Sequence, residues 1–459
     1  MLLYEIILTF ALCPRIYNLM RYISTSDQSI TDLRGAIMHC MAPDGSLYLP
    51  EMLPVIPKAY FNNIQEMSLQ EIAFVVVSTL LGSDVDTTAL KHIVDMSFNF
   101  PMPVYPLANN LDILELFHGP TMAFKDAGAR FLAYFVSQFH KSNSRRPMGL
   151  VATTGNTGAA IANAFMRHKD KHVAILFPRG AMSRAQLAQI AIKSPNIHVI
   201  EVSGNISQCK EIIRTAMSDQ SLAERMMPVC VNTNNFLRIV PQVVFFFHAY
   251  AMLKNIHGHA DGFTVSIPCG CLSNLTAAVI AKRIGCPIGK IVAGCNANDD
   301  FVRVLEGELP PEKVHINNRP TLARAMDSGA PTNLRRILHL YNNDIEAIRE
   351  DITGISLSDD DIADTINGTF ARRGYLTDPH TAVALGALSR SGIDYSYAPA
   401  VVLATAHPAK SLDTMTAITG RSVELPLQLT RFMTDPHSRQ IPVKIPPTYP
   451  ALKKYLFSI

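Results

Sequence analysis

The chain lacks a large excess of charge of either sign. Its 459 residues include 41 lysines and arginines against 38 aspartates and glutamates, a formal net charge of +3. A surface that holds nucleic acid needs a much larger basic imbalance, so nucleic-acid binding is excluded and small-molecule chemistry is favoured. Charged residues make up 17% and hydrophobic residues 48%, which excludes a disordered chain. At roughly 150 residues per domain, this length allows two or three domains.

Cysteine is sparse and scattered. Eight cysteines stand at positions 13, 40, 209, 230, 269, 271, 286 and 295. This scatter excludes the disulfide framework of a small secreted domain and predicts reduced thiols. Cys269 and Cys271 are the one closely spaced pair, and zinc would need a second pair or nearby histidines in the same module. We therefore expect no metal site.

A membrane-spanning run is missing from the N-terminus. Residues 1–13 are apolar, but they fall short of the ~20 residues of a spanning helix, and Glu5 interrupts them. A signal peptide would carry lysine or arginine before its apolar run, whereas Arg15 and Arg21 follow this one. The globular pattern starts directly after Met20. We therefore expect residues 1–19 to be an extension, and the protein to be cytoplasmic and free of membranes.

From about residue 145, short β-branched or apolar runs alternate with helical patterns, which is typical of a parallel sheet with crossover helices. The expected strands are 150–153, 172–177, 198–202, 263–267, 290–294 and 400–405. The expected helices are 157–168, 183–193, 206–217, 236–254 and 274–284. The pattern predicts a doubly wound α/β fold.

The other regions have weaker patterns. Residues 20–100 read as mostly helical around a turn-rich patch at 42–50, and we expect them to form a separate N-terminal domain. The α/β core is assigned to 101–440, with a helix-rich insertion or lid at 305–400. The tail at 441–459 is rich in proline and is expected to lie irregularly on the surface.

The segment His118–Gly128 carries the densest chemical signal. Its Lys125 follows Ala123 and Phe124 within a stretch bounded by glycine and proline. A lysine in such surroundings is a candidate for a partly desolvated amine, whose lowered pKa suits Schiff-base formation. An ordinary surface lysine is the alternative, since lysines are usually exposed.

Two loops have the composition of anion sites. Residues 151–160 (VATTGNTGAA) and 266–276 (SIPCGCLSNLT) each run from an expected strand through small and polar residues into a helix. Such a loop aims backbone N–H groups and a helix N-terminus at one point, which suits a carboxylate or phosphate. A purely structural turn with a polar cap uses similar residues.

These segments, in order along almost the whole chain from Tyr22, resemble the threonine synthases, which are pyridoxal-phosphate enzymes of the fold type of the tryptophan synthase β subunit. The resemblance is carried by 22–25, 42–50, the lysine segment, the Asn156 loop, 232–238, 296–299, 321–327 (TLARAMD), 374–380 (GYLTDPH) and 405–410. It implies two lobes of doubly wound parallel sheets around a pyridoxal-phosphate cleft, with a helical N-terminal domain.

The resemblance also implies roles for residues at the cofactor ring. Lys125 matches the lysine that holds pyridoxal phosphate as a Schiff base and then moves protons. Asn156 matches the side chain beside the phenolic oxygen of the cofactor, and Thr405 matches the hydroxyl that faces the pyridine nitrogen. Because a hydroxyl cannot stabilise a protonated ring as an aspartate would, the enzyme must rely more on Lys125. Phe124 is expected to pack near the cofactor ring, but it could equally be an ordinary core residue. Thr405 could instead be the N-cap of the helix that follows it.

The cofactor phosphate is expected on the loop formed by Cys269, Gly270, Cys271, Leu272, Ser273 and Asn274. The chain departs from the family here, since the related pattern is Ser-Gly-Asn-Phe-Gly followed by Asp or Asn. Backbone N–H donors survive this change, but one amide side chain and the second glycine are lost.

The resemblance further implies a substrate site. Thr153, Thr154 and Thr157 are expected to line the loop that grips the substrate carboxylate. Asn235 and Arg238, three residues apart, are expected to reach the substrate phosphate together. Arginine suits this role because its guanidinium holds two phosphate oxygens at once. A structural ion pair at the domain boundary is the alternative for Arg238, and Arg303 and Lys410 are the alternative cations.

The implied reaction is the conversion of O-phospho-L-homoserine and water to L-threonine and phosphate, with pyridoxal phosphate as cofactor. Two rivals stay open. One is another pyridoxal-phosphate lyase of the same fold, such as a threonine dehydratase. The other is a threonine-synthase-like binding protein without turnover, which the altered loop at 269–274 favours. The sequence does not indicate an oligomeric state.

Overall fold

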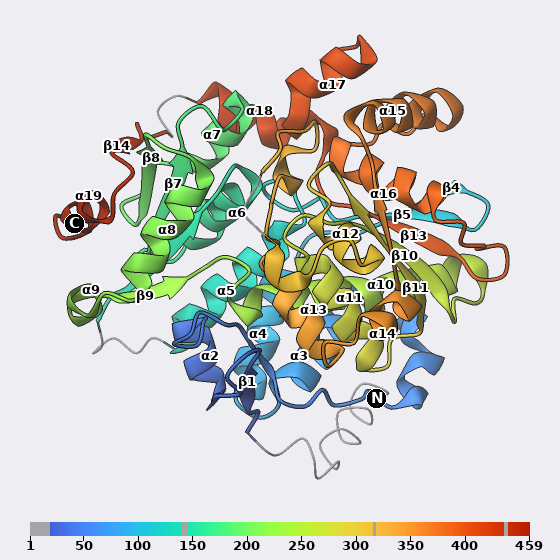
Figure 1. Cartoon of the computed structure of the whole chain (residues 1–459), viewed down its shortest axis with the longest axis horizontal. Helices are drawn as coiled ribbons and strands as arrows, with labels where there is room; N and C mark the ends of the chain where they lie inside the picture. Colours follow the sequence, from blue (N-terminus) through green and yellow to red (C-terminus); the bar gives the residue numbers. More distant parts are fainter. Residues whose placement is uncertain (1–18, 140–144, 315–317, 436–438) are drawn as a thin grey trace.

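The computed structural model describes residues 19–139, 145–314, 318–435 and 439–459. Residues 1–18 of the expected extension therefore lie outside the described residues. The chain folds into two α/β lobes that lie side by side above the N-terminal elements, which are drawn in blue in Figure 1.

The smaller lobe is built on a parallel five-stranded sheet of order β14-β8-β7-β6-β9. Its strands are β6 (Pro147–Ala152), β7 (His172–Pro178), β8 (Ile197–Val202), β9 (Met227–Cys230) and β14 (Val443–Ile445). Its helices are α6 (Asn156–Phe165), α7 (Arg184–Ile190), α8 (Ile206–Met217), α9 (Gln220–Arg225) and α19 (Tyr449–Leu456). The central strands are buried on both faces, as their continuous apolar runs predict.

The larger lobe holds a six-stranded sheet of order β12-β11-β10-β13-β5-β4, parallel except for the β4–β5 hairpin. Its strands are β4 (Val104–Ala108), β5 (Leu111–Glu115), β10 (Phe263–Pro268), β11 (Ile288–Cys295), β12 (Ile352–Ser356) and β13 (Ala400–Ala404). Its helices are α10 (Val240–His257), α11 (Ser273–Arg283), α12 (Asp300–Glu306), α13 (Leu334–Leu340), α14 (Ile345–Asp351), α15 (Asp359–Arg373), α16 (Pro379–Arg390) and α17 (Leu412–Thr419). Helices α5 (Lys125–Phe139) and α18 (Leu427–Thr434) pack on α6 and α7 of the smaller lobe, respectively.

The N-terminal region contains helices α2 (Leu33–His39), α3 (Leu69–Leu81) and α4 (Thr87–Ser97). It also contains a small antiparallel sheet of order β2-β1-β3, formed by β1 (Tyr22–Ser24), β2 (Ile30–Thr31) and β3 (Tyr48–Pro50), which the sequence did not predict. The largest cluster of buried apolar side chains runs from Tyr22 to Leu403. The N-terminal region thus shares a continuous core with the rest of the chain.

The apolar helix α10 runs through this core. The stretch Phe236–His257 is long and apolar enough to cross a membrane, but 94% of its apolar window is buried inside the protein. A helix that is surrounded by other elements needs no polar face, which explains why α10 is apolar all round.

All six expected strands and all five expected helices are present near the predicted positions. The prediction of a doubly wound α/β fold with parallel sheets is confirmed. Two hairpin strands, β4 and β5, were missed. They are joined at Asn109 and Asn110, the second with φ 54°, and Pro106 is tolerated because β4 is an edge strand.

Two other expectations were wrong. The tail at 441–459 is not irregular, because β14 pairs with the edge of β8 and α19 packs on α8. Pro450 stands in the first turn of α19, where a missing N–H costs nothing. The region 305–400 is not an insertion or lid, because β12 is the edge strand of the larger sheet and α16 packs on β10 and β11.

Candidate active site

Backbone pairing brings the lysine segment to the end of β13. The Phe124 amide donates to the Thr405 carbonyl at 2.9 Å, and the His407 amide donates to the Met122 carbonyl at 3.2 Å. Ala123 and Ala406 form an antiparallel bridge between these two bonds. The amine of Lys125, at the start of α5, is thereby placed near Thr405.

Two further loops reach the same place from neighbouring strand ends. Strand β10, next to β13, leads through residues 269–272 into α11, and β6 of the smaller lobe leads through Gly155 into α6. Gly155 has φ 146°, a conformation that needs glycine. The carboxyl ends of parallel strands are where open α/β sheets bind ligands, so the three segments converge at the expected edge.

A cavity lies where the three segments meet. Nine predicted cofactor residues line it: Phe124, Lys125, Asn156, Gly270, Cys271, Leu272, Ser273, Asn274 and Thr405. Pro268, Ala325, Met326 and His380 line it as well. The structure therefore brings together segments that are up to 281 residues apart, between Phe124 and Thr405, into one small chamber.

The amine of Lys125 is set up as a nucleophile. Burial lowers the pKa of Lys125, and the nearby Arg238 guanidinium lowers it further, against an opposing effect of the Cys271 thiol. Its Nζ lies 4.5 Å from the centroid of the Phe124 ring. A lowered pKa increases the fraction of neutral amine, which is the form that adds to a carbonyl carbon.

Cys271 is a half-buried free thiol that stands where the related pattern has asparagine. Burial raises the pKa of this thiol, but the Lys125 ammonium and hydrogen bonds from Ser273 and Thr233 outweigh burial, so its pKa is lowered. The lysine and the thiol therefore stabilise each other's charged forms.

The residues present fit the phosphate of pyridoxal phosphate. Helix α11 begins at Ser273 without a side-chain cap within the described chain, so its first N–H groups are available to an anion. The side-chain oxygens of Asn156 and Asn274 are buried and have no partner among the described residues, and both residues line the cavity. Buried polar atoms are normally hydrogen-bonded, so these atoms await a ligand group or water.

The backbone at Met326 approaches position 270 so closely that only glycine fits there. A Cβ built on Gly270 would lie 2.8 Å from Cα and 3.3 Å from the carbonyl oxygen of Met326, and neither backbone atom can move freely.

We predict that Gly270→Ala displaces the phosphate loop and weakens both folding and cofactor binding, by about 1–3 kcal/mol as overpacked sites do. Thermal unfolding and cofactor titration measure the two effects. Gly368→Ala is the matched control, because its Cβ would meet flexible atoms of Arg372 on the helix surface. Equal cofactor affinity in wild type and Gly270→Ala would refute this packing argument.

Three predicted site residues, Cys269, Asn235 and Thr153, lie outside the cavity lining given above. Cys269 does not face the cavity, because its amide donates to Gly294 at 2.7 Å and its thiol donates to Ile267. Asn235 is fully used within the protein: its amide nitrogen donates to Ile37 and Cys230, and its oxygen caps the turn that follows.

Thr153 is the third of these residues, and its role at the substrate carboxylate stays a prediction. Its hydroxyl accepts the amide hydrogens of Gly155 and Gly158, both at 3.0 Å, and so it closes the turn before α6. Thr154 and Thr157 are half-buried on the same loop, outside the cavity lining given above. Their contact with a substrate carboxylate stays a prediction.

Arg238 is buried near the cavity, close enough to Lys125 to lower the pKa of that lysine. It is only 2% exposed, and its Nε and Nη1 have no hydrogen-bond partner among the described residues. Burial lowers its pKa to about 10, so it remains charged at neutral pH. Asp126 acts on this guanidinium through space, but it does not bond to Nε or Nη1, and an incoming phosphate would satisfy these donors.

The two alternative cations are engaged elsewhere. Arg303 is half-exposed and pairs with Glu308 at 3.6 Å. Lys410 is buried and donates to the Thr121 carbonyl at 2.6 Å and to Gln189 Oε1 at 2.8 Å. Both cationic groups therefore have partners within the protein.

The sequence interpretation missed some residues at the site. His380, Ala325 and Met326 belong to motifs that carry the resemblance, and their order along the chain gave no sign that they meet at the cavity. Lys210 on α8 is half-buried. Burial lowers the pKa of Lys210, and the smaller effect of the Cys271 thiol raises it. No local pattern around Lys210 marks it, because its place depends on how the lobes pack.

Comparisons with known proteins agree with this geometry. A family profile described as pyridoxal-phosphate dependent enzyme matches residues 113–405. Profiles described as threonine synthase N terminus and threonine synthase, C-terminal match residues 21–98 and 381–447. The threonine synthase of Serratia marcescens is 31% identical over 92% of this chain and 96% of its own. That of Escherichia coli is 30% identical over 92% and 96%.

Solved structures are similar too. The pyridoxal-phosphate-bound threonine synthase of Brucella melitensis is similar with a TM-score of 0.86 and 27% identity, over 95% of this chain and 98% of its own. A threonine deaminase of Solanum lycopersicum is similar with a TM-score of 0.52 and 15% identity, over 73% and 95%, which shows a shared fold alone.

Proposed function

The chain belongs to the threonine synthase family, and from that premise we propose that it converts O-phospho-L-homoserine and water to L-threonine and phosphate. The observation that supports this substrate most directly is Arg238, a buried cation with unpartnered donors that is distinct from the phosphate loop of the cofactor. A substrate phosphate needs such a second cation, and an unphosphorylated amino acid does not.

Pyridoxal phosphate, the family's cofactor, supplies a carbonyl that condenses with amines and a ring that accepts electron density from the substrate Cα. The N–H groups at the start of α11, with Asn274, would hold its phosphate. Asn156 and Thr405, from opposite lobes, would hold its ring, and Lys125 would supply the amine.

The reaction needs protons removed at Cα and Cβ, the phosphate lost from Cγ, a proton added at Cγ, water added at Cβ, and a proton returned to Cα. Lys125 is the mobile amine in the cavity, and its lowered pKa makes it a better group to take a proton and to return one. Arg238 would neutralise the charge that grows on the leaving phosphate. Thr154 and Thr157 would orient the substrate carboxylate.

The test is a product assay on the purified enzyme with added pyridoxal phosphate. We expect O-phospho-L-homoserine to give L-threonine and phosphate in equal amounts. Ammonia release from L-threonine would indicate the dehydratase reaction instead, and neither product would indicate a binding protein.

We also propose that the protein acts in the cytoplasm on a small molecule. The seven described cysteines are free thiols, as a reducing compartment would keep them.

A further inference from the structure

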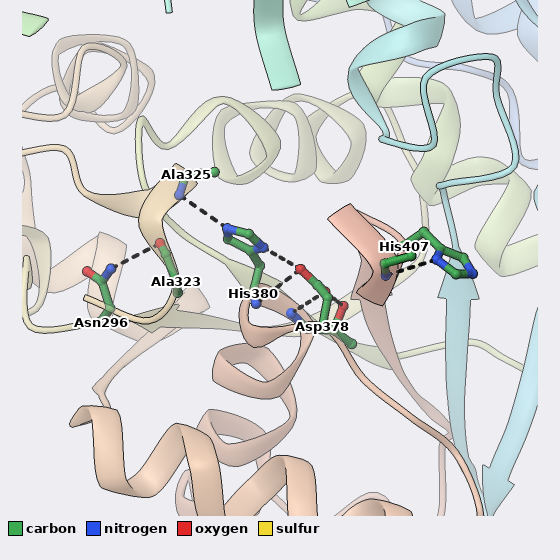
Figure 2. Close-up of polar contacts among 8 residues, drawn as sticks. Asn296, Ala323, Ala325, Asp378, His380 and His407 are labelled. Atoms are coloured by element: carbon green, nitrogen blue, oxygen red, sulfur yellow. Dashed lines mark hydrogen bonds and ion pairs between the residues drawn. The ribbon is translucent and has the colours of Figure 1, made fainter. Parts of the chain in front are cut away.

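Asp378, His380 and Ala325 form a chain of hydrogen bonds beside the cavity (Figure 2). The carboxylate of Asp378 caps α16 and contacts His380 Nδ1, and it also accepts from the Thr381 amide at 3.0 Å. Burial raises the pKa of Asp378, but His380 and the capping bonds outweigh it, so its pKa is lowered and the carboxylate is ionised. An ionised carboxylate accepts, so Nδ1 of His380 carries the proton.

The other ring nitrogen of His380 faces a backbone donor. The Ala325 amide donates to His380 Nε2 at 3.2 Å. A neutral imidazole with its proton on Nδ1 can accept this bond, whereas an imidazolium has no lone pair left for it.

Ala325 lies in the middle of the segment 321–327, whose two ends are tied together. Asn296 Nδ2 donates to Thr321 Oγ1 at 2.7 Å and to Asp327 Oδ1 at 3.0 Å, and Thr321 Oγ1 donates to Asp327 Oδ1 at 2.6 Å. The segment is therefore a closed loop with fixed ends, and His380 holds its tip. This explains why the motifs at 296–299, 321–327 and 374–380 occur together.

The tip of this loop presses on the phosphate loop. Met326, the residue after Ala325, is the backbone that approaches Gly270 so closely that a Cβ there would lie 2.8 Å away. Ala325, Met326 and His380 all line the cavity with Gly270. A movement of the tip therefore changes the support behind the cofactor phosphate.

We propose that His380 is a positioning residue for the phosphate loop: by accepting from the Ala325 amide, its ring holds residues 324–326 against Gly270, and loss of this acceptor weakens cofactor binding. The inference depends on the cofactor site and not on the identity of the substrate.

The ring of His380 is itself held in place. Asp378, at the start of α16, contacts Nδ1, so Nε2 stays directed at the Ala325 amide.

The experiment compares the apo-proteins of wild type, His380→Gln and His380→Leu. Pyridoxal-phosphate affinity is measured by absorbance titration at one fixed pH. Glutamine keeps an acceptor for the Ala325 amide, and leucine has none.

We expect His380→Gln to bind the cofactor as wild type does. His380→Leu should bind it about tenfold more weakly, which is the effect of one hydrogen bond. Equal cofactor affinity in wild type and His380→Leu would overturn the proposal. So would a fall in the unfolding temperature of apo His380→Leu with unchanged cofactor affinity, because that result assigns His380 to folding alone.

Discussion

Replacing Lys125 with alanine is expected to abolish turnover, with a loss of kcat on the order of 10⁴-fold or more, as when a nucleophile is removed. Lys125 is both the amine that holds the cofactor and the group that moves protons. Asp126, its neighbour, cannot replace it, because its carboxylate accepts from the Thr121 amide at 2.8 Å and the Thr121 hydroxyl at 2.6 Å.

Phosphate release from O-phospho-L-homoserine measures this prediction, and Lys91→Ala, at an exposed position on α4, is the control. Borohydride should fix the chromophore in wild type and in the control but not in Lys125→Ala. More than a trace of phosphate release by Lys125→Ala would show that the lysine is misassigned.

Arg238→Lys is expected to raise the KM for O-phospho-L-homoserine and to lower kcat/KM by about 1.5–3 kcal/mol, the value of a hydrogen bond to a charged group. Lysine keeps the charge but loses the planar fork that holds two phosphate oxygens. The spectrum of bound pyridoxal phosphate should be unchanged, because the phosphate loop is formed by other residues. Steady-state kinetics and a visible spectrum check both expectations.

Arg336 provides the contrast. It is fully buried, and its guanidinium donates to the carbonyls of Tyr48, Thr233 and Asn234 at 2.6–3.1 Å. Arg336→Lys should therefore lower the unfolding temperature, whereas Arg238→Lys should not, because Nε and Nη1 of Arg238 have no protein partner to lose. An Arg238→Lys enzyme with normal kinetics and reduced stability would assign Arg238 to folding.

The sequence predicted the features that depend on local residue patterns, namely the strands and the starts of the helices that follow them. Strand β7 is an unbroken apolar run, and Asn156 and Ser273 begin helices directly after strands, so their meeting at the sheet edge follows from the α/β pattern. The role of Lys125 needed the family resemblance, because a lysine that follows apolar residues is usually an exposed one.

The remaining features depend on packing between segments that are far apart in the chain. Asn235 has the composition of a ligand-binding residue, but its partners at Ile37 and Cys230 could not be known before the fold. Likewise, His380 meets Ala325 across 55 residues of sequence. The proline-rich tail was misjudged because proline is compatible with a first helical turn and with the flanks of an edge strand.

The most direct test of the central claim is the fate of labelled oxygen when the enzyme acts on O-phospho-L-homoserine in H₂¹⁸O. Loss of phosphate from Cγ breaks the carbon–oxygen bond, and water then adds at Cβ. The account predicts one ¹⁸O in the hydroxyl group of L-threonine and none in the released phosphate. Label in the phosphate, with homoserine as the other product, would mean phosphorus–oxygen cleavage by a phosphatase and would contradict the account.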